Sequence, residues 1–176
     1  ETDYLGYLTY RLLKKEVEIG KPVLCVGNLV IGGAGKTPLV IKIRQLLSRD
    51  YSKIFVLTRG YLGKNKGPLI VKKTMHFQDV GDESLIHANF GSTCVSKNKV
   101  EGAKLCKKNG ADLIILDDGL QSINVKKKMS LLVIDSFYGT KNRFIFPSGP
   151  LRQPTKDALE LCLSLIHISE PTRRRT

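Results

Sequence analysis

The residues best suited to chemistry form a glycine-rich run that ends in a lysine and a threonine. The run reads Gly32-Gly33-Ala34-Gly35-Lys36-Thr37. Such a turn between a strand and a helix can aim successive backbone N–H groups at a phosphate, and the helix dipole adds to the attraction. The lysine can reach the β- and γ-phosphates of a nucleotide, and the threonine hydroxyl suits magnesium. The run therefore predicts a loop that binds ATP and Mg²⁺ in an enzyme that transfers the terminal phosphate.

This loop departs from the standard pattern G-x-x-x-x-G-K-[ST] at one position. Counting back from Gly35, the first glycine of the pattern falls on Val30. The context still favours a phosphate loop, because an apolar run precedes it and Pro38 suits the first turn of a helix. The alternative is an ordinary glycine-rich turn next to an incidental lysine.

Two acidic residues form a second candidate site. Asp117 and Asp118 end an apolar run, and Gly119 lets the chain turn away after them. In a parallel sheet, carboxylates at that end of a strand face the phosphate loop. One of them can hold the magnesium shared with Thr37. Paired aspartates also occur as plain strand ends or helix caps, so the metal site is favoured only together with the loop.

Apolar runs and helical periodicity indicate the elements that position these residues. Strands are predicted at 22–26, 53–58, 69–71, 92–96, 112–116 and 130–134. Helices are predicted over 38–47 and 99–109, and a loop leads into a helix within 76–89. Alternating strands and helices predict an α/β fold of the P-loop NTPase type, whose mostly parallel sheet has helices on both faces.

The two ends of the chain depart from this pattern. Residues 3–17 have a helical spacing of leucines and a basic polar face, which fits a helix packed on the domain or one lying on an anionic membrane. Leu163–Arg173 matches the translation of a sequencing adapter, and the alternative is a genuine amphipathic C-terminus. We therefore expect an N-terminal helix within 1–20, a nucleotide-binding kinase domain over 21–160 and a non-native tail over 161–176. The natural protein is expected to continue into a C-terminal domain.

The composition indicates a globular domain with anionic partners. The chain has 176 residues and a formal net charge of +13, with 41% hydrophobic and 26% charged residues. The charge favours phosphates or an anionic membrane surface. No nucleic-acid partner is expected, because the basic runs lack interleaved aromatics. The four cysteines form no C-x-x-C pair and are expected to be free thiols. No stretch is long and apolar enough to span a bilayer.

Five segments occur in an order that is typical of one family. They are Val26–Pro38, Thr58–Tyr61, Val80–Glu83, Asp117–Gln121 and Pro147–Pro154. In this combination the chain resembles the tetraacyldisaccharide 4'-kinases, the lipid A 4'-kinases of Gram-negative bacteria, over about residues 3–160. The family also lacks the first glycine of the loop, so Val30 fits the resemblance.

The resemblance implies an activity, a substrate and a location. Enzymes of this family use ATP and Mg²⁺ to phosphorylate the 4'-hydroxyl of an acylated glucosamine disaccharide 1-phosphate. They work as peripheral proteins at the cytoplasmic face of the inner membrane, and their active site lies between the nucleotide-binding domain and a smaller C-terminal domain. The resemblance does not identify whether there is a protein partner.

The resemblance also assigns roles to residues of this chain. Asp82 is the expected base for the proton of the sugar hydroxyl. The other residues expected to act in catalysis are Lys36, Arg59 and Asp118. The expected nucleotide ligands are Gly32, Gly33, Ala34, Gly35, Lys36 and Thr37. Thr37 and Asp117 are expected to hold Mg²⁺, and Arg152 is expected to steady phosphate charge.

Three positions depart from the family pattern. The chain has Ser84 where proline is common, Ser122 where histidine is common, and Gln153 where glutamate is common. Two other functions are compatible with the loop and the aspartate pair. One is a P-loop NTPase that acts as a switch or chaperone on a protein partner, and the other is a truncated domain that no longer folds or acts.

Overall fold

The computed structural model describes residues 15–30, 35–135, 144–145, 148–152, 154–156 and 164–168, with the backbone alone at 135 and 164–168. The predicted ligands Gly32, Gly33 and Ala34 lie outside the described residues. So does most of the predicted N-terminal helix. Its described end at 15–17 is not helical, and Val17 instead forms a parallel bridge with Val125.

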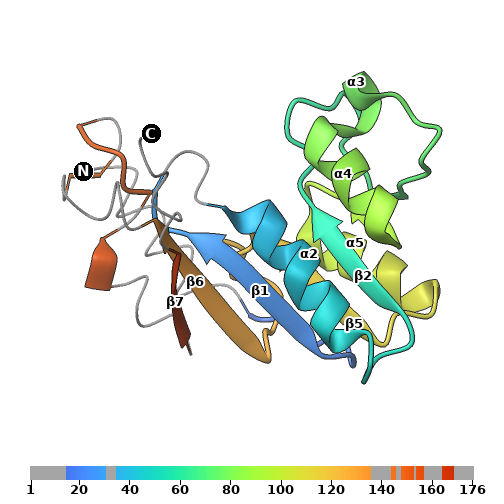
Figure 1. Ribbon diagram of the computed structural model, residues 1–176, viewed down its shortest axis with the longest axis horizontal. Coiled ribbons are helices and arrows are strands. Elements are labelled where there is room, and N and C mark those ends of the chain that lie inside the picture. The colour runs from blue at the N-terminus through green and yellow to red at the C-terminus, as the bar shows by residue number, and fades with distance from the viewer. Residues whose placement is uncertain are drawn as a thin grey trace, which may run out of the picture.

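A seven-stranded sheet in the order β3-β4-β2-β5-β1-β6-β7 forms the centre of the molecule (Figure 1). Its strands are β1 (Val23–Asn28), β2 (Ile54–Thr58), β3 (Leu69–Ile70), β4 (Thr93–Val95), β5 (Leu113–Asp117), β6 (Met129–Asp135) and β7 (Ser164–Ile168). All neighbouring strands are parallel except β3 and β4, which are antiparallel. Every residue of β1, β2 and β5 is buried, as expected for parallel strands covered on both faces.

Helices cover both faces of this sheet. Helix α2 (Lys36–Leu47) packs through Val40 against Val26 and Ile115, and α4 (Asp82–Phe90) contacts α2. Helix α5 (Lys99–Lys108) packs on the opposite face, and a short α3 (Phe77–Val80) precedes α4. The predicted α/β class with a mostly parallel sheet and helices on both faces is therefore confirmed.

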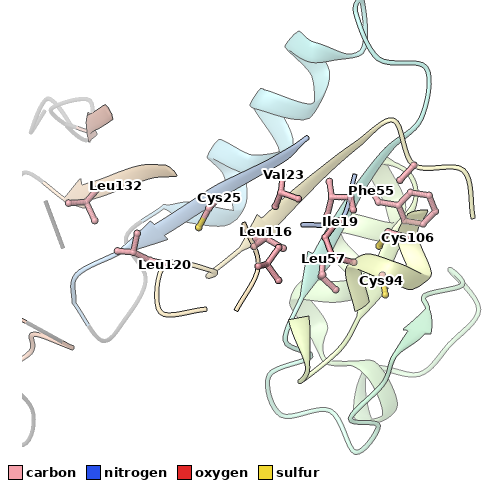
Figure 2. Packing of buried hydrophobic residues seen from close by; sticks show 14 of the residues in the cluster. Ile19, Val23, Cys25, Phe55, Leu57, Cys94, Cys106, Leu116, Leu120 and Leu132 are labelled. Atoms are coloured by element: carbon pink, nitrogen blue, oxygen red, sulfur yellow. The ribbon is translucent and has the colours of Figure 1, made fainter. Parts of the chain in front are cut away.

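The core on the side of α5 consists mainly of large apolar side chains such as Phe55 and Leu57, with the thiols of Cys94 and Cys106 among them (Figure 2). A Cβ atom at Gly102 would lie 2.7 Å from both Leu57 Cδ1 and Ser96 Cβ, so the helix approaches the strands as closely as a glycine allows. Cys25, Cys94 and Cys106 are buried cysteines that are not joined in disulfides, as predicted. Cys162 lies outside the described residues.

Strand β7 was not predicted from the sequence. Ser164–Ile168 pairs in parallel with β6, from Leu131 opposite Ser164 to Asp135 opposite Ile168. A strand at the edge of a sheet offers unpaired N–H and C=O groups, and a short segment rich in isoleucine and leucine is suited to pair with them. The non-native origin of residues 161–176 stays a prediction. No helix among the described residues is long and apolar enough to cross a membrane.

Candidate nucleotide-binding site

The site lies at the edge of the sheet where β1 and β5 end. These strands are neighbours in register, with Val26 opposite Asp117, so the loop after β1 and the aspartates after β5 emerge side by side. Gly35 adopts a left-handed φ of 70° just before α2. Gly35, the N-cap residue of α2, makes no side-chain cap, and the backbone N–H groups at such a helix start are suited to bind an anion.

Lys36 lies between the ends of the two strands. Its Nζ donates to Asn28 Oδ1 at 3.0 Å and lies 3.7 Å from Asp118 Oδ1. Asn28 is fully buried, and its Nδ2 donates to the Val30 carbonyl at 2.8 Å. The lysine is thus held by an amide and a carboxylate next to the loop. The sequence reasoning missed Asn28, although this residue lies in the first family segment.

Asp118 is the centre of an ion-pair network. It has a left-handed φ of 57°, and its carboxylate accepts from Arg152 Nη1 at 3.0 and 2.8 Å. The backbone N–H of Arg152 donates to the Leu29 carbonyl at 2.8 Å. The fifth family segment therefore packs against the start of the phosphate loop. In this arrangement the guanidinium expected to steady phosphate charge is paired with Asp118.

Asp117 has a different environment. Its side chain is buried, and its Oδ2 lies 2.7 Å from Nε2 of His87, which is also fully buried. Asp117 Oδ1 and His87 Nδ1 have no hydrogen-bond partner among the described residues. The sequence reasoning missed His87, because a lone histidine in a helix carries no recognisable spacing signal.

Asp82 and Glu83 open α4 and extend the acidic side of the site. Asp82 is exposed, and its Oδ1 accepts from the Glu83 backbone N–H at 2.9 Å. The pKa of Glu83 is raised by partial burial, and further by Asp117, while Lys36 opposes the shift. The third family segment is therefore within electrostatic range of Lys36 and of the aspartate pair. Glu83 was not predicted as a site residue, although it belongs to the Gly-Asp-Glu segment.

The second family segment joins the third at the end of β2. Thr58 Oγ1 and Ser84 Oγ are hydrogen-bonded at 2.8 Å, and both residues are buried. Serine at 84, where the family often has proline, thus supplies a contact between α4 and β2. Gly60 has a φ of 70°, and a Cβ atom there would lie 2.5 Å from Val95 Cγ1. Arg59 is exposed beside this turn.

The residues present fit a magnesium ion bound together with a phosphate. Asp117 Oδ1 is a buried oxygen without a partner in the described part of the chain, which is the state of an oxygen available to a cation. The described residues contain no group of three or more His, Cys, Asp or Glu side chains that could hold a metal. Mg²⁺ suits such a site, because it binds through one or two protein ligands plus phosphate oxygens and water.

Comparisons with known proteins agree with this geometry. The family model described as Tetraacyldisaccharide-1-P 4'-kinase matches residues 5–176. The tetraacyldisaccharide 4'-kinase of Rhodopseudomonas palustris (strain HaA2) is 43% identical over 165 residues, which are 93% of this chain and 49% of that protein. The enzyme of the same name from Afipia carboxidovorans is 39% identical over 160 residues, 91% of this chain and 48% of that protein. The chain thus spans about half the length of these curated relatives.

A solved structure is also similar to this chain. It is the crystal structure of LpxK from Aquifex aeolicus in complex with ATP, with a TM-score of 0.84 and 26% sequence identity. The similarity covers 99% of this chain and 56% of that one. The comparisons favour the kinase over the protein-directed switch or chaperone.

Proposed function

This chain belongs to the tetraacyldisaccharide-1-P 4'-kinase family, and we propose that it is the ATP-binding part of such a kinase. The reaction transfers the terminal phosphoryl group of ATP to the 4'-hydroxyl of an acylated glucosamine disaccharide 1-phosphate. The observation that supports it best is the placement of Lys36, at the start of α2, against Asn28 and Asp118 at the ends of two neighbouring strands.

Phosphate binding is assigned to the loop and to the start of α2. Backbone N–H groups of the loop, with the predicted ligands Gly32, Gly33, Ala34 and Gly35, would surround the phosphates. Lys36 supplies a cation that is already oriented by its contact with Asn28 at 3.0 Å. Pre-oriented charge stabilises a transferring phosphoryl group without further rearrangement.

The two aspartates have separate roles in this proposal. Asp117 would hold Mg²⁺ through its unpartnered Oδ1, together with the hydroxyl of Thr37. Asp118 instead pairs with Arg152 and lies near Lys36, so it positions the cations of the site. When bound, the metal would neutralise charge on the β- and γ-phosphates.

Asp82 is proposed as the base that accepts the proton of the sugar hydroxyl. It is exposed at the first residue of α4, so a hydroxyl arriving from outside the domain can reach it. Its Oδ1 is oriented by the Glu83 N–H, which leaves Oδ2 to face the acceptor. Arg59, exposed at the end of β2, would add positive charge on the same edge.

The lipid substrate places the reaction at a membrane surface. A formal net charge of +13 favours peripheral association with anionic lipid, as at the cytoplasmic face of the inner membrane. The acyl disaccharide and this surface are the proposed partners, and nucleic acid is not among them.

Two measurements on the chain test this proposal. Calorimetry should show ATP binding, and γ-labelled ATP should label a tetraacyldisaccharide 1-phosphate presented in detergent micelles. Lys36→Ala should weaken ATP binding by about 100-fold, because it removes the cation from the phosphates. Lys42→Ala, on the exposed side of the same helix, is the matched control and should bind ATP normally.

Asp82→Asn should separate binding from transfer. The amide keeps the shape of the side chain but cannot accept the proton, so transfer should fall by about 100-fold or more while ATP affinity stays within about twofold. A wild-type chain that binds no ATP would refute the proposal. ATP binding without lipid labelling would refute the kinase activity of this chain and leave the nucleotide site standing.

A further inference from the structure

A buried histidine–carboxylate pair connects α4 to the end of β5. His87 Nε2 and Asp117 Oδ2 are 2.7 Å apart, and the relative exposures of these two side chains are 0% and 4%. Burying polar groups of this kind costs free energy unless their hydrogen-bonding capacity is used. The pair is therefore expected to have a function beyond packing.

The hydrogen bond has a defined direction. A carboxylate that is to bind a cation only accepts hydrogen bonds, so the arrangement suits the His87 tautomer whose Nε2 carries the hydrogen and donates it to Oδ2. This contact occupies one carboxylate oxygen and leaves the other without a partner among the described residues. Asp117 thus has one oxygen fixed by the protein and one available to a ligand.

The histidine is itself held in place through its backbone. Arg44 Nη1 donates to the His87 carbonyl at 3.2 Å, and Arg44 belongs to α2, the helix that begins with Lys36 and Thr37. One continuous set of contacts therefore runs from the phosphate-binding helix through α4 to Asp117. These contacts hold the Asp117 carboxylate through its Oδ2.

We infer that His87 is a positioning residue that orients Asp117 so that Oδ1 faces the Mg²⁺ of the nucleotide complex. This inference rests on the proposed function. A hydrogen-bonded outer partner fixes the orientation of a metal ligand, and its loss commonly weakens metal binding by about 10- to 100-fold. Here the outer partner is the imidazole and the ligand is the carboxylate.

The test compares two variants that differ in their ability to donate. His87→Met removes the donor at similar volume, whereas His87→Gln keeps an N–H near the position of Nε2. Calorimetric titration of the full chain with ATP at increasing Mg²⁺ gives the apparent metal affinity. In His87→Met this affinity should fall by about 10-fold or more, and His87→Gln should recover most of it. ATP affinity in EDTA should change by less than about twofold in both variants, because the phosphate contacts are untouched.

A matched control lies one turn earlier on the same helix. Ser84→Ala removes the buried contact with Thr58 but does not touch Asp117, so it should leave the Mg²⁺ dependence unchanged. An equal loss in Ser84→Ala, or wild-type Mg²⁺ dependence in His87→Met, would overturn the inference while the proposed function stands. A wild-type chain without Mg²⁺-dependent ATP binding would overturn both.

A second measurement needs no variant of His87. The chain has three histidines, so ¹⁵N-histidine spectra resolve each ring. Adding Mg²⁺ to the ATP-loaded protein should shift the ring resonances of His87 but not those of His76, which is exposed at the start of α3. In Asp117→Asn this shift should disappear. An unshifted His87 ring in the wild-type protein would contradict the inference.

Discussion

The two faces of the sheet are stabilised in different ways. Under α5 the contacts are almost wholly apolar and involve small residues and thiols, such as Ala103 and Cys106 against Leu57. On the face of α2 and α4, buried polar contacts from Arg44, His87 and Ser84 are added to the apolar packing. Apolar burial stabilises without direction, whereas hydrogen bonds also fix orientation. The helices that carry the proposed site are therefore the ones with directional contacts.

Among the described residues, one cationic side chain is buried on each face, and these two side chains differ as well. Arg44 donates to the carbonyls of His87, Ile54 and Ser92. Lys99, at the start of α5, is 7% exposed, and its Nζ donates to the Leu57 carbonyl across a long distance of 3.4 Å. Arginine is suited to the first role because its guanidinium offers five donors in a fixed plane, whereas lysine has a single flexible ammonium.

Removing Arg44 should have the largest effect on stability. Arg44→Met keeps much of the volume but leaves the carbonyls of His87, Ile54 and Ser92 without this donor. We expect a loss of about 3–5 kcal/mol in the free energy of unfolding, measured with urea. Arg49→Met, at an exposed position, is the control and should change the value by less than about 0.5 kcal/mol. A loss below about 1 kcal/mol for Arg44→Met would mean that the polar contacts do not anchor this face.

Replacing Lys99 should increase stability in a pH-dependent way. Burial lowers its pKa to about 8 from 10.5, although Asp117 and Asp118 oppose the shift. Between these values the unfolded chain binds more protons than the folded one, so wild-type stability gains from this group as the pH rises. Lys99→Met should be more stable than wild type by about 1–2 kcal/mol at pH 7, and the difference should shrink between pH 8 and 10.5. Urea unfolding of both proteins across this pH range checks the prediction. A stability difference that does not change with pH would contradict it.

Filling the contact between α5 and the sheet should have a smaller effect. In Gly102→Ala the added Cβ atom would clash with Leu57 and Ser96, at 2.7 Å from each. The clash outweighs the gain in helix propensity, and we expect a net loss of about 1 kcal/mol with unchanged ATP affinity. Lys104→Ala, on the exposed side of the same helix, serves as the control. A fall in the ATP affinity of Gly102→Ala, in addition to its loss of stability, would show that the packing of α5 also positions the candidate site.

Glu83→Gln should give the smallest change. The raised pKa means that the charged form of Glu83 is disfavoured in the folded state, so wild-type stability falls as the pH rises above the ordinary value of 4.5. The amide resembles the protonated acid, so the variant should melt about 1–2 °C higher at pH 7 and match wild type near pH 4. Calorimetric melting at both pH values checks this. A higher melting temperature of the variant at pH 4 as well would point to a cause other than charge.

The sequence predicts most of the fold because the signals for strands and helices are local. Apolar runs such as Leu113–Leu116 and the glycine-rich turn before Lys36 are typical of their elements wherever they occur. Predicted and observed boundaries differ by one or two residues, for example 22–26 against Val23–Asn28. Strand β7 was not predicted because its residues fall within the segment assigned to a non-native tail, and its partner is an open sheet edge, which no local pattern reveals.

The residues of the candidate site also fall into two groups: those that a local motif predicts and those that depend on contacts between elements. Lys36, Thr37, Asp117 and Asp118 are predicted as site residues from motifs, which depend on neighbours in the sequence. Asn28, Glu83 and His87 lie in or near those motifs, but their partners come from other elements. His87 and Asp117 are 30 positions apart in the sequence, and Asp118 and Arg152 are 34 positions apart.

By itself, the sequence determines the type of sheet, the phosphate-binding loop and the family of this chain. Only the tertiary structure decides which aspartate is left with a free oxygen and which one neutralises Lys36 and Arg152. The physical reason is that adjacent residues point in different directions at the end of a strand. Asp117 is the last residue of β5, whereas Asp118 turns into the left-handed region, so the two carboxylates meet different neighbours.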